Sequence, residues 1–141
     1  MGYERLDTVF RLWHIPNMEW EVEVTDQFEA WWDGLTEAEQ EDIDAKVRLL
    51  EQHGPGLRRP HVGTIDNSRH RNMKELIVQH AGRPYRVLFA FDPQRCAILL
   101  IGGDKTGNAR WYEEYVPVAD DLYDEHIETL RREERQRREE R

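Results

Sequence analysis

Four basic or aromatic side chains lie near the ends of predicted strands and at the start of the last predicted helix. These residues are Lys74, Arg86, Lys105 and Tyr112. Positioned cations can stabilise the charge of a crowded phosphate, and lysine or tyrosine can transfer protons beside it. Each residue also has a structural interpretation, since Arg86 would suit a solvated sheet face and Tyr112 a core. The starts of neighbouring antiparallel strands lie at opposite ends, so the spacing leaves both arrangements open.

Other kinds of chemistry have little support in the sequence. The six histidines show no metal-ligand spacing, and a single cysteine, Cys96, cannot build a zinc cluster. Ser68 is the only serine and lacks a nucleophile-elbow motif. Residues 102–108 are glycine-rich, but their glycine and lysine spacing is not that of a P-loop. We therefore expect no metal and no cofactor, and we expect Cys96 to lie in the core.

The charge is distributed unevenly along the chain. Residues 1–54 carry 4 basic and 14 acidic side chains, residues 55–110 carry 10 and 4, and residues 111–141 carry 6 and 11. The total of −9 therefore hides a middle segment with a net charge of +6. A local basic face of this kind suits contact with phosphate, although a solvated sheet surface of mixed charge would have the same composition.

The N-terminal half predicts a strand followed by a helical hairpin. Apolar and acidic residues alternate over residues 19–24, which is typical of a half-buried strand. Thr25 is a typical helix N-cap, and Thr36 with Glu39 forms a capping box for a second amphipathic helix. The second helix should end at residues 54–55, a Gly-Pro pair.

The C-terminal half predicts an antiparallel meander and a final helix. Residues 54–72 show little periodicity and predict a long loop. Three strands should follow at about residues 73–80, 84–91 and 96–102, and short turns between them favour antiparallel pairing. The last of these strands is apolar on both faces, so it should be central and covered. A helix follows, which Pro117 should interrupt or restart. The fold class is therefore α+β.

The ends of the chain differ from its middle. We expect an N-terminal extension at residues 1–17, one domain at residues 18–130, and a frayed or disordered charged tail at residues 131–141. The sequence predicts no membrane segment and no signal peptide. A single cysteine excludes an internal disulfide, which favours a cytoplasmic location. Monomeric and weakly dimeric states are both compatible with the sequence.

Short motifs in the second half resemble those of a known toxin family. They are Asn-Met-Lys-Glu-Leu at 72–76, Tyr-Arg-Val-Leu at 85–88, Ile-Gly-Gly-Asp-Lys-Thr at 101–106 and Trp-Tyr at 111–112. Their order and spacing resemble the RelE/ParE superfamily of type II toxin–antitoxin systems, and the phage-derived HigB-like branch above all. The predicted order of strand, helical hairpin, meander and helix is also similar to that of the superfamily.

The resemblance implies a toxin that cleaves mRNA on the ribosome without a metal ion. It also implies a HigA-like helix-turn-helix antitoxin as partner. Residue by residue, Arg86 matches the strand arginine that contacts the scissile phosphate, and Lys105 matches the basic residue after the fourth strand. Tyr112 matches the tyrosine of RelE-like members, and Lys74 matches a second-strand lysine. The chain departs from the family at Ile77, where an arginine is common.

Several roles remain open within this resemblance. Tyr112 or Lys74 would transfer protons if packed arginines lowered their pKa, while His70 and His61 are rival carriers because of their ordinary pKa. The side chains predicted to contact RNA are Arg69, His70, Arg71, Arg83, Arg110 and His61. The same fold also includes ParE-like gyrase inhibitors, and a non-catalytic antitoxin-binding protein would be consistent with Ile77.

Overall fold

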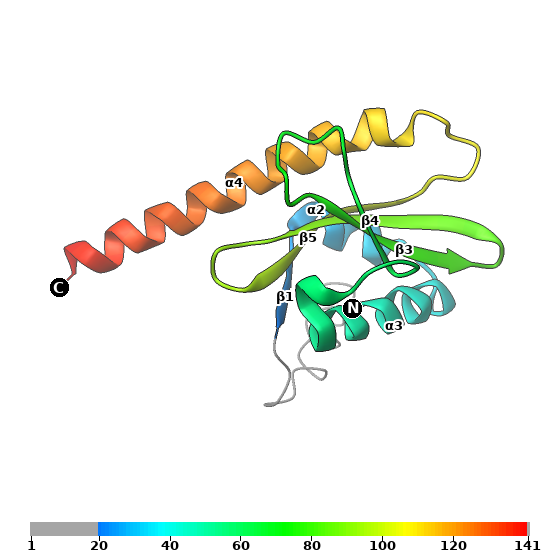
Figure 1. Cartoon of the computed structure of the whole chain (residues 1–141), viewed down its shortest axis with the longest axis horizontal. Coiled ribbons are helices and arrows are strands. Elements are labelled where there is room, and N and C mark those ends of the chain that lie inside the picture. The colour runs from blue at the N-terminus through cyan, green and yellow to red at the C-terminus, as the bar shows by residue number, and fades with distance from the viewer. Residues whose placement is uncertain (1–19, 141) are drawn as a thin grey trace.

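The computed structural model describes residues 20–140, so the predicted extension at residues 1–17 lies outside the described residues. The strands are β1 (Glu21–Val24), β2 (Val62–Thr64), β3 (Lys74–His80), β4 (Arg83–Phe91) and β5 (Cys96–Asp104). The helices are α2 (Asp26–Asp33), α3 (Glu37–His53), the short 3-10 helix η1 (Gly54–Gly56) and α4 (Trp111–Glu139). Helices α2 and α3 cover one face of a single sheet, and α4 crosses the other (Figure 1). The predicted α+β fold is confirmed.

The sheet has the strand order β1-β5-β4-β3-β2. Strands β3, β4 and β5 form the predicted antiparallel meander, and β1 pairs parallel with β5. The prediction of a covered central strand is also confirmed, since residues 96–100 of β5 are buried and contribute to the cores on both faces. The sheet therefore separates two hydrophobic cores.

Both predicted N-caps are present in the helical hairpin. The Thr25 hydroxyl accepts a hydrogen bond from the Phe28 backbone N–H, and the Thr36 hydroxyl accepts one from Glu39 N–H. The Glu39 carboxylate in turn accepts a hydrogen bond from the Thr36 backbone N–H, which completes the capping box. These bonds satisfy backbone donors that a helix start leaves unpaired.

Three expectations need correction. The predicted loop at residues 54–72 contains η1 and the short strand β2, which pairs antiparallel with β3 and is too short to show a periodic pattern. Pro117 does not interrupt α4, because it removes only one N–H donor while Val116 and Ala119 pack on the sheet. Residues 131–139 continue as regular helix, with Glu134 paired to arginines three and four residues later. Among the described residues, no helix is both long and apolar enough to cross a membrane.

Two consecutive glycines in β5 let a tryptophan approach each face of the sheet. A Cβ atom on Gly102 would overlap the ring of Trp31 from α2, and one on Gly103 would lie 2.7 Å from Nε1 of Trp111. The missing side chains therefore allow close packing of both rings. Because Trp111 is the first residue of α4, Gly103 helps to set where this helix begins.

Candidate active site

Two of the four predicted catalytic residues, Arg86 and Tyr112, contact a carboxylate, Glu75, and a third, Lys105, lies beside Tyr112. The Tyr112 hydroxyl donates to Glu75 Oε1 at 2.5 Å, and Arg86 Nε lies 3.1 Å from the same oxygen. The Lys105 ammonium lies 5.6 Å from the centre of the Tyr112 ring. We call Glu75, Arg86, Lys105 and Tyr112 the Glu75 cluster. It combines a buried acid with an arginine and a phenol that contact it, and with a lysine beside the phenol.

The sheet register explains how this cluster forms. Ile77 of β3 lies opposite Arg86 of β4, so Glu75 and Arg86 are diagonal neighbours on the face that α4 covers. Arg86 in turn lies opposite Gly103 of β5. Since Gly103 leaves room for Trp111, the next residue of α4, Tyr112, can reach over the strand to Glu75. The cluster therefore depends on four separate elements of the fold.

The electrostatics of the cluster favour an uncharged Tyr112. Burial raises the pKa of Tyr112, and its hydrogen bond to Glu75 raises it further, while Arg86 opposes both effects. Arg86 thus lowers the pKa of Tyr112, as expected of a nearby arginine, but burial and Glu75 outweigh it, so the net shift is upward rather than downward. A tyrosine that stays protonated at neutral pH can donate a proton or a hydrogen bond, but it is a poor general base.

Glu75 and Arg86 form a largely buried ion pair. Glu75 is 7% exposed, and the Arg86 side chain is 14% exposed. Arg86 Nη1 donates to the Tyr85 carbonyl oxygen at 2.9 Å, whereas Arg86 Nε lies near Glu75 without forming an aligned hydrogen bond. Loss of either partner would leave a buried charge without its counter-charge, which is costly.

A fifth residue of this region, Arg59, has no distinguishing pattern in the sequence. Gly63 of β2 lies opposite Glu75 of β3. A Cβ atom on Gly63 would lie 2.9 Å from Glu75 Oε2 and 3.1 Å from Arg59 Nη2, so the side chains of Glu75 and Arg59 both lie next to Gly63. Arg59 precedes β2 in the segment that predicts a loop. Glu75 carries a weak signal, since it is an acid at the start of a largely apolar strand.

Lys74 lies on the other face of the sheet. Successive side chains of a strand point to opposite faces, and Glu75 faces α4. Lys74 has the same parity as Leu76 and Val78, which pack in the core beneath α3. The structure therefore does not bring Lys74 into the Glu75 cluster.

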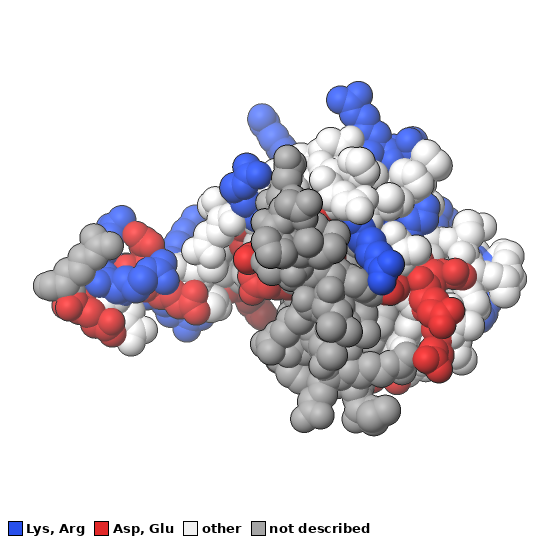
Figure 2. Space-filling view, turned by 90° about the horizontal axis from the view of Figure 1, so that it is seen from below, with Lys and Arg blue, Asp and Glu red and all other residues white. Residues whose placement is uncertain are grey.

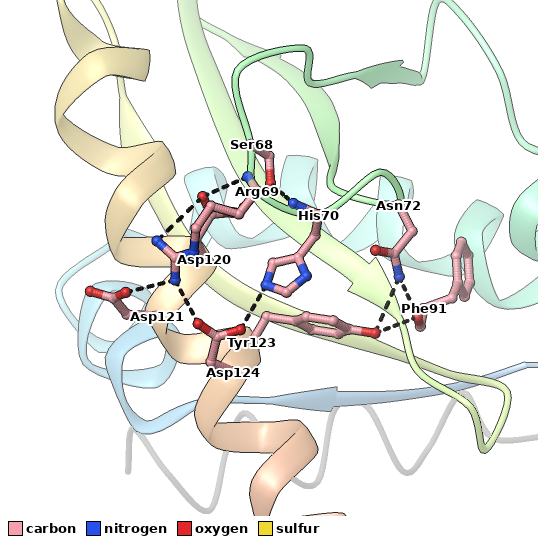
Figure 3. Close-up of polar contacts among 9 residues, drawn as sticks. All are labelled: Ser68, Arg69, His70, Asn72, Phe91, Asp120, Asp121, Tyr123 and Asp124. Carbon is pink, nitrogen blue, oxygen red and sulfur yellow. Dashed lines mark hydrogen bonds and ion pairs between the residues drawn. The ribbon is translucent and has the colours of Figure 1, made fainter.

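Two of the predicted RNA-binding residues, Arg69 and His70, contact acidic residues of α4 instead (Figure 3). Arg69 Nη2 lies 2.9 Å from Asp121 and 2.5 Å from Asp124, and His70 Nε2 lies 2.8 Å from Asp124. The hydrogen bond from Arg69 lowers the pKa of Asp124. These contacts neutralise much of the positive charge that the sequence places in this loop.

Buried groups complete this attachment of the loop to α4. Asp120 is 2% exposed and accepts hydrogen bonds from the Ser68 hydroxyl at 2.5 Å and from the Arg69 backbone N–H at 3.0 Å. Asn72 Nδ2 donates to the Phe91 carbonyl oxygen at 2.9 Å, and the Tyr123 hydroxyl donates to the same oxygen at 3.1 Å. The loop before β3 is therefore fixed to the middle of α4 (Figure 3).

Of the other predicted RNA-binding residues, Arg83 and His61 contact the α3 side of the sheet, away from the Glu75 cluster, whereas Arg110 and Arg71 are exposed. Arg83 lies on the α3 face, where it is 3.5 Å from both Glu39 and Asp104. His61 Nδ1 lies 2.8 Å from the Lys46 ammonium of α3. Arg110 is exposed and pairs with Glu113 at 3.0 Å. Arg71 is also exposed.

One group of described residues has the composition of a metal site. Glu23, Asp92 and Cys96 each offer a ligand atom, and these atoms lie within 4.8 Å of one another. The groups already satisfy each other, since the Cys96 thiol donates to Glu23 and Asp92 accepts from the Cys96 backbone N–H and contacts His126. Burial raises the pKa of the Cys96 thiol, which disfavours the thiolate form that metals bind. We interpret this group as structural.

Comparison with known proteins identifies the family. Residues 30–124, more than half of the chain, match the family described as phage-derived protein Gp49-like (DUF891). Two similar proteins are the candidate toxins HigB2 and HigB3 of Mycobacterium tuberculosis (strain ATCC 25618 / H37Rv). HigB2 is 43% identical over 110 residues, which cover 77% of this chain and 54% of HigB2. HigB3 is 47% identical over 95 residues, which cover 67% of this chain and 82% of HigB3.

This chain thus spans about half the length of HigB2 and most of HigB3. No solved structure shows significant similarity to it. The family match and these two relatives confirm the resemblance to HigB-like proteins that the motifs indicate. The chain therefore belongs to the phage-derived Gp49-like family.

Proposed function

We propose that this protein is the toxin of a type II toxin–antitoxin module and cleaves mRNA on the ribosome without a metal ion. The Glu75 cluster carries this proposal, since it combines a carboxylate, two cations and a protonated phenol. The candidate toxins HigB2 and HigB3 support the toxin role by their similarity to this chain. Action on ribosomes would place the protein in the cytoplasm.

In the proposed reaction, Glu75 accepts the proton of the RNA 2′-hydroxyl. The 2′-oxygen then attacks the neighbouring phosphorus, and the bond from phosphorus to the 5′-oxygen breaks. Arg86 and Lys105 stabilise the negative charge that develops on the phosphate. Tyr112 gives its proton to the leaving 5′-oxygen, a role that its raised pKa permits because the phenol is protonated before the reaction. The products are a 2′,3′-cyclic phosphate and a 5′-hydroxyl.

Arg59 could supply a further cation to the same phosphate. The family often has an arginine where this chain has Ile77, and Ile77 lies opposite Arg86 on the cluster face. Arg59, which precedes β2, lies near Glu75 beside Gly63, on the other side of β3 from Arg86. We propose that Arg59 compensates for the missing arginine and that the exposed residues Arg71 and Arg110 contact the RNA backbone.

The proposed partners are the ribosome with its mRNA and a HigA-like antitoxin with a DNA-binding helix-turn-helix. Arg69 and His70 would have a different role from the one first expected. Because they contact three aspartates of α4, we propose that they hold the loop before β3 in place rather than bind RNA.

Primer extension on an mRNA in a translating extract tests the proposed activity. Wild-type protein should produce discrete cuts that require ribosomes, and Arg86→Ala should produce none. Arg83→Ala is the matched control, since this neighbouring arginine lies on the opposite face of the sheet and should leave cleavage largely intact. Absence of cuts by wild type, with translation unaffected, would refute the nuclease and favour a gyrase inhibitor or a non-catalytic antitoxin-binding protein.

A further inference from the structure

A groove lies between the free end of α4 and the turn that joins β4 to β5. We call residues 127–139 of α4 the arm, and its outer part projects beyond the sheet (Figure 1). The groove has a volume of about 500 Å³. Its lining residues are Pro93 and Gln94 from the turn and Ile127, Leu130, Arg131, Glu134, Arg135 and Arg138 from the arm.

The floor of this groove is apolar. Ile127 packs partly against the core beneath α4, and Leu130, one turn later, is also only partly buried. Pro93 faces them from the turn. Since residues 127, 130, 134 and 138 follow one another at helical spacing, the groove runs along one face of the arm. An apolar stripe on a helix that leaves the body of the protein is a common place for another helix to pack.

The rim of the groove is positively charged. Basic and acidic side chains are intermixed along the arm (Figure 2), but three of the four charged residues that line the groove are arginines. The one acid, Glu134, is already paired with Arg137 at 2.9 Å and Arg138 at 3.5 Å. Arg135 pairs only with exposed Glu128, at 3.5 Å, and such surface pairs are weak. Arg131 has no ion-pair partner within residues 20–140.

We propose that this groove binds an acidic amphipathic helix of a partner protein. Apolar residues of that helix would cover Ile127, Leu130 and Pro93, and its carboxylates would pair with the arginines at the rim. The arm from residue 127 to 138 is about 17 Å long, which corresponds to about three turns of a packed helix. Nucleic acid would also be attracted to the cations, but this aliphatic floor offers its bases no stacking partner. The proposal does not depend on the proposed RNA cleavage.

Binding of designed peptides to the full chain tests this proposal. The probe is a dye-labelled helical peptide with leucine along one face and glutamate elsewhere, and the matched peptide has lysine in place of every glutamate. Fluorescence anisotropy should show binding of the acidic peptide about tenfold tighter than that of the basic peptide. Arg131→Glu/Arg135→Glu should weaken binding of the acidic peptide about tenfold.

Two control proteins locate the effect. Arg58→Glu/Arg132→Glu changes the net charge equally but alters exposed residues outside the groove, so it should stay within about twofold of wild type. Leu130→Gln should weaken binding even at high salt, where charge effects are screened. Equal losses in the two double variants, equal binding of both peptides, or no binding of the acidic peptide would overturn the proposal. Displacement of the peptide by single-stranded RNA alone would point to a nucleic-acid site instead.

Discussion

Replacement of Glu75 by glutamine separates the chemistry of the Glu75 cluster from its packing. Glutamine has nearly the same shape as glutamate, so it can still accept a hydrogen bond from the Tyr112 hydroxyl, but it cannot accept a proton as a general base. It also removes the negative charge 3.1 Å from Arg86 Nε. Both consequences can be measured separately, as cleavage rate and as stability.

The expected losses follow from the surroundings of Glu75. Removal of a general base slows a reaction by about 10²–10⁴-fold, so cleavage by Glu75→Gln should fall in this range. Loss of one partner from a fully buried ion pair costs about 3–5 kcal/mol. Arg86 is 14% exposed and keeps its hydrogen bond to Tyr85, so the free energy of unfolding should fall by less, about 2–3 kcal/mol.

The variant should also lower the pKa of Tyr112. Burial, the largest cause of its raised pKa, remains, but the hydrogen bond and charge of Glu75 no longer add to it, while Arg86 still opposes it. Ultraviolet titration of tyrosinate in wild type and Glu75→Gln, each compared with the same protein carrying Tyr112→Phe, isolates this one phenol.

Single-turnover cleavage with ribosomes provides the rate. Glu113→Gln is a suitable control, because Glu113 is 65% exposed and pairs only with the exposed Arg110 among the described residues. If Glu75→Gln cleaves as fast as this control, Glu75 is not the base. A Tyr112 pKa that rises in Glu75→Gln would refute the electrostatic account of the cluster.

Three further predictions concern other parts of the fold. Gly103→Ala should displace Trp111, because the new Cβ would lie 2.7 Å from its Nε1. In a urea titration, this variant should lower the free energy of unfolding by about 1–3 kcal/mol. Gly56→Ala is the control and should change that free energy little, because no atom lies within 4 Å of its new Cβ. Burial raises the pKa of Glu51 from 4.5 to about 7, so the folded protein binds the extra proton and its stability should fall as pH rises between these values. At pH values above this window, the free energy of unfolding of Glu51→Gln, measured by urea titration, should therefore exceed that of wild type by about 1–3 kcal/mol. Equal stability of the two proteins at those pH values would contradict the raised pKa. Asp120→Asn should lower the free energy of unfolding by about 1–3 kcal/mol and speed hydrogen exchange in the loop before β3. The control Asp121→Asn changes an exposed residue and should have a much smaller effect. Equal effects of the two variants would refute the anchoring role of Asp120.

Local signals in the sequence were sufficient for most of the fold. Thr25, Thr36 and Glu39 identify both helix starts, since a capping side chain bonds to residues only a few positions away. The meander follows from apolar runs and short turns. Strand β2 could not be predicted, because three residues are too few for a period and its position depends on hydrogen bonds to the distant strand β3.

The candidate site was less accessible to sequence reasoning. The motifs indicate Arg86, Lys105 and Tyr112 together. The alternation of side chains along a strand, which places Lys74 on the opposite face, depends on where the strand begins. The role of Glu75 cannot be predicted from its motif, because nothing local shows that two other elements bring a tyrosine and an arginine to it. The aspartates that neutralise Arg69 lie more than 50 residues further along the chain.

The length of α4 has a mechanical consequence. Its 29 residues form one rod of about 43 Å, with Tyr112 near one end and the free arm at the other. The Tyr123 hydroxyl donates a hydrogen bond to the sheet, and Tyr123 lies along the helix about 17 Å from Tyr112 and about 24 Å from Glu139. If the helix turned rigidly about Tyr123 against the packing of Trp111, Val116 and Ala119, a sideways movement of about 3 Å at Glu139 would move Tyr112 by about 2 Å. Such a displacement would break the 2.5 Å hydrogen bond from Tyr112 to Glu75. A ligand that pulls on the arm strongly enough to overcome this packing would thus displace Tyr112 without contacting any residue of the cluster.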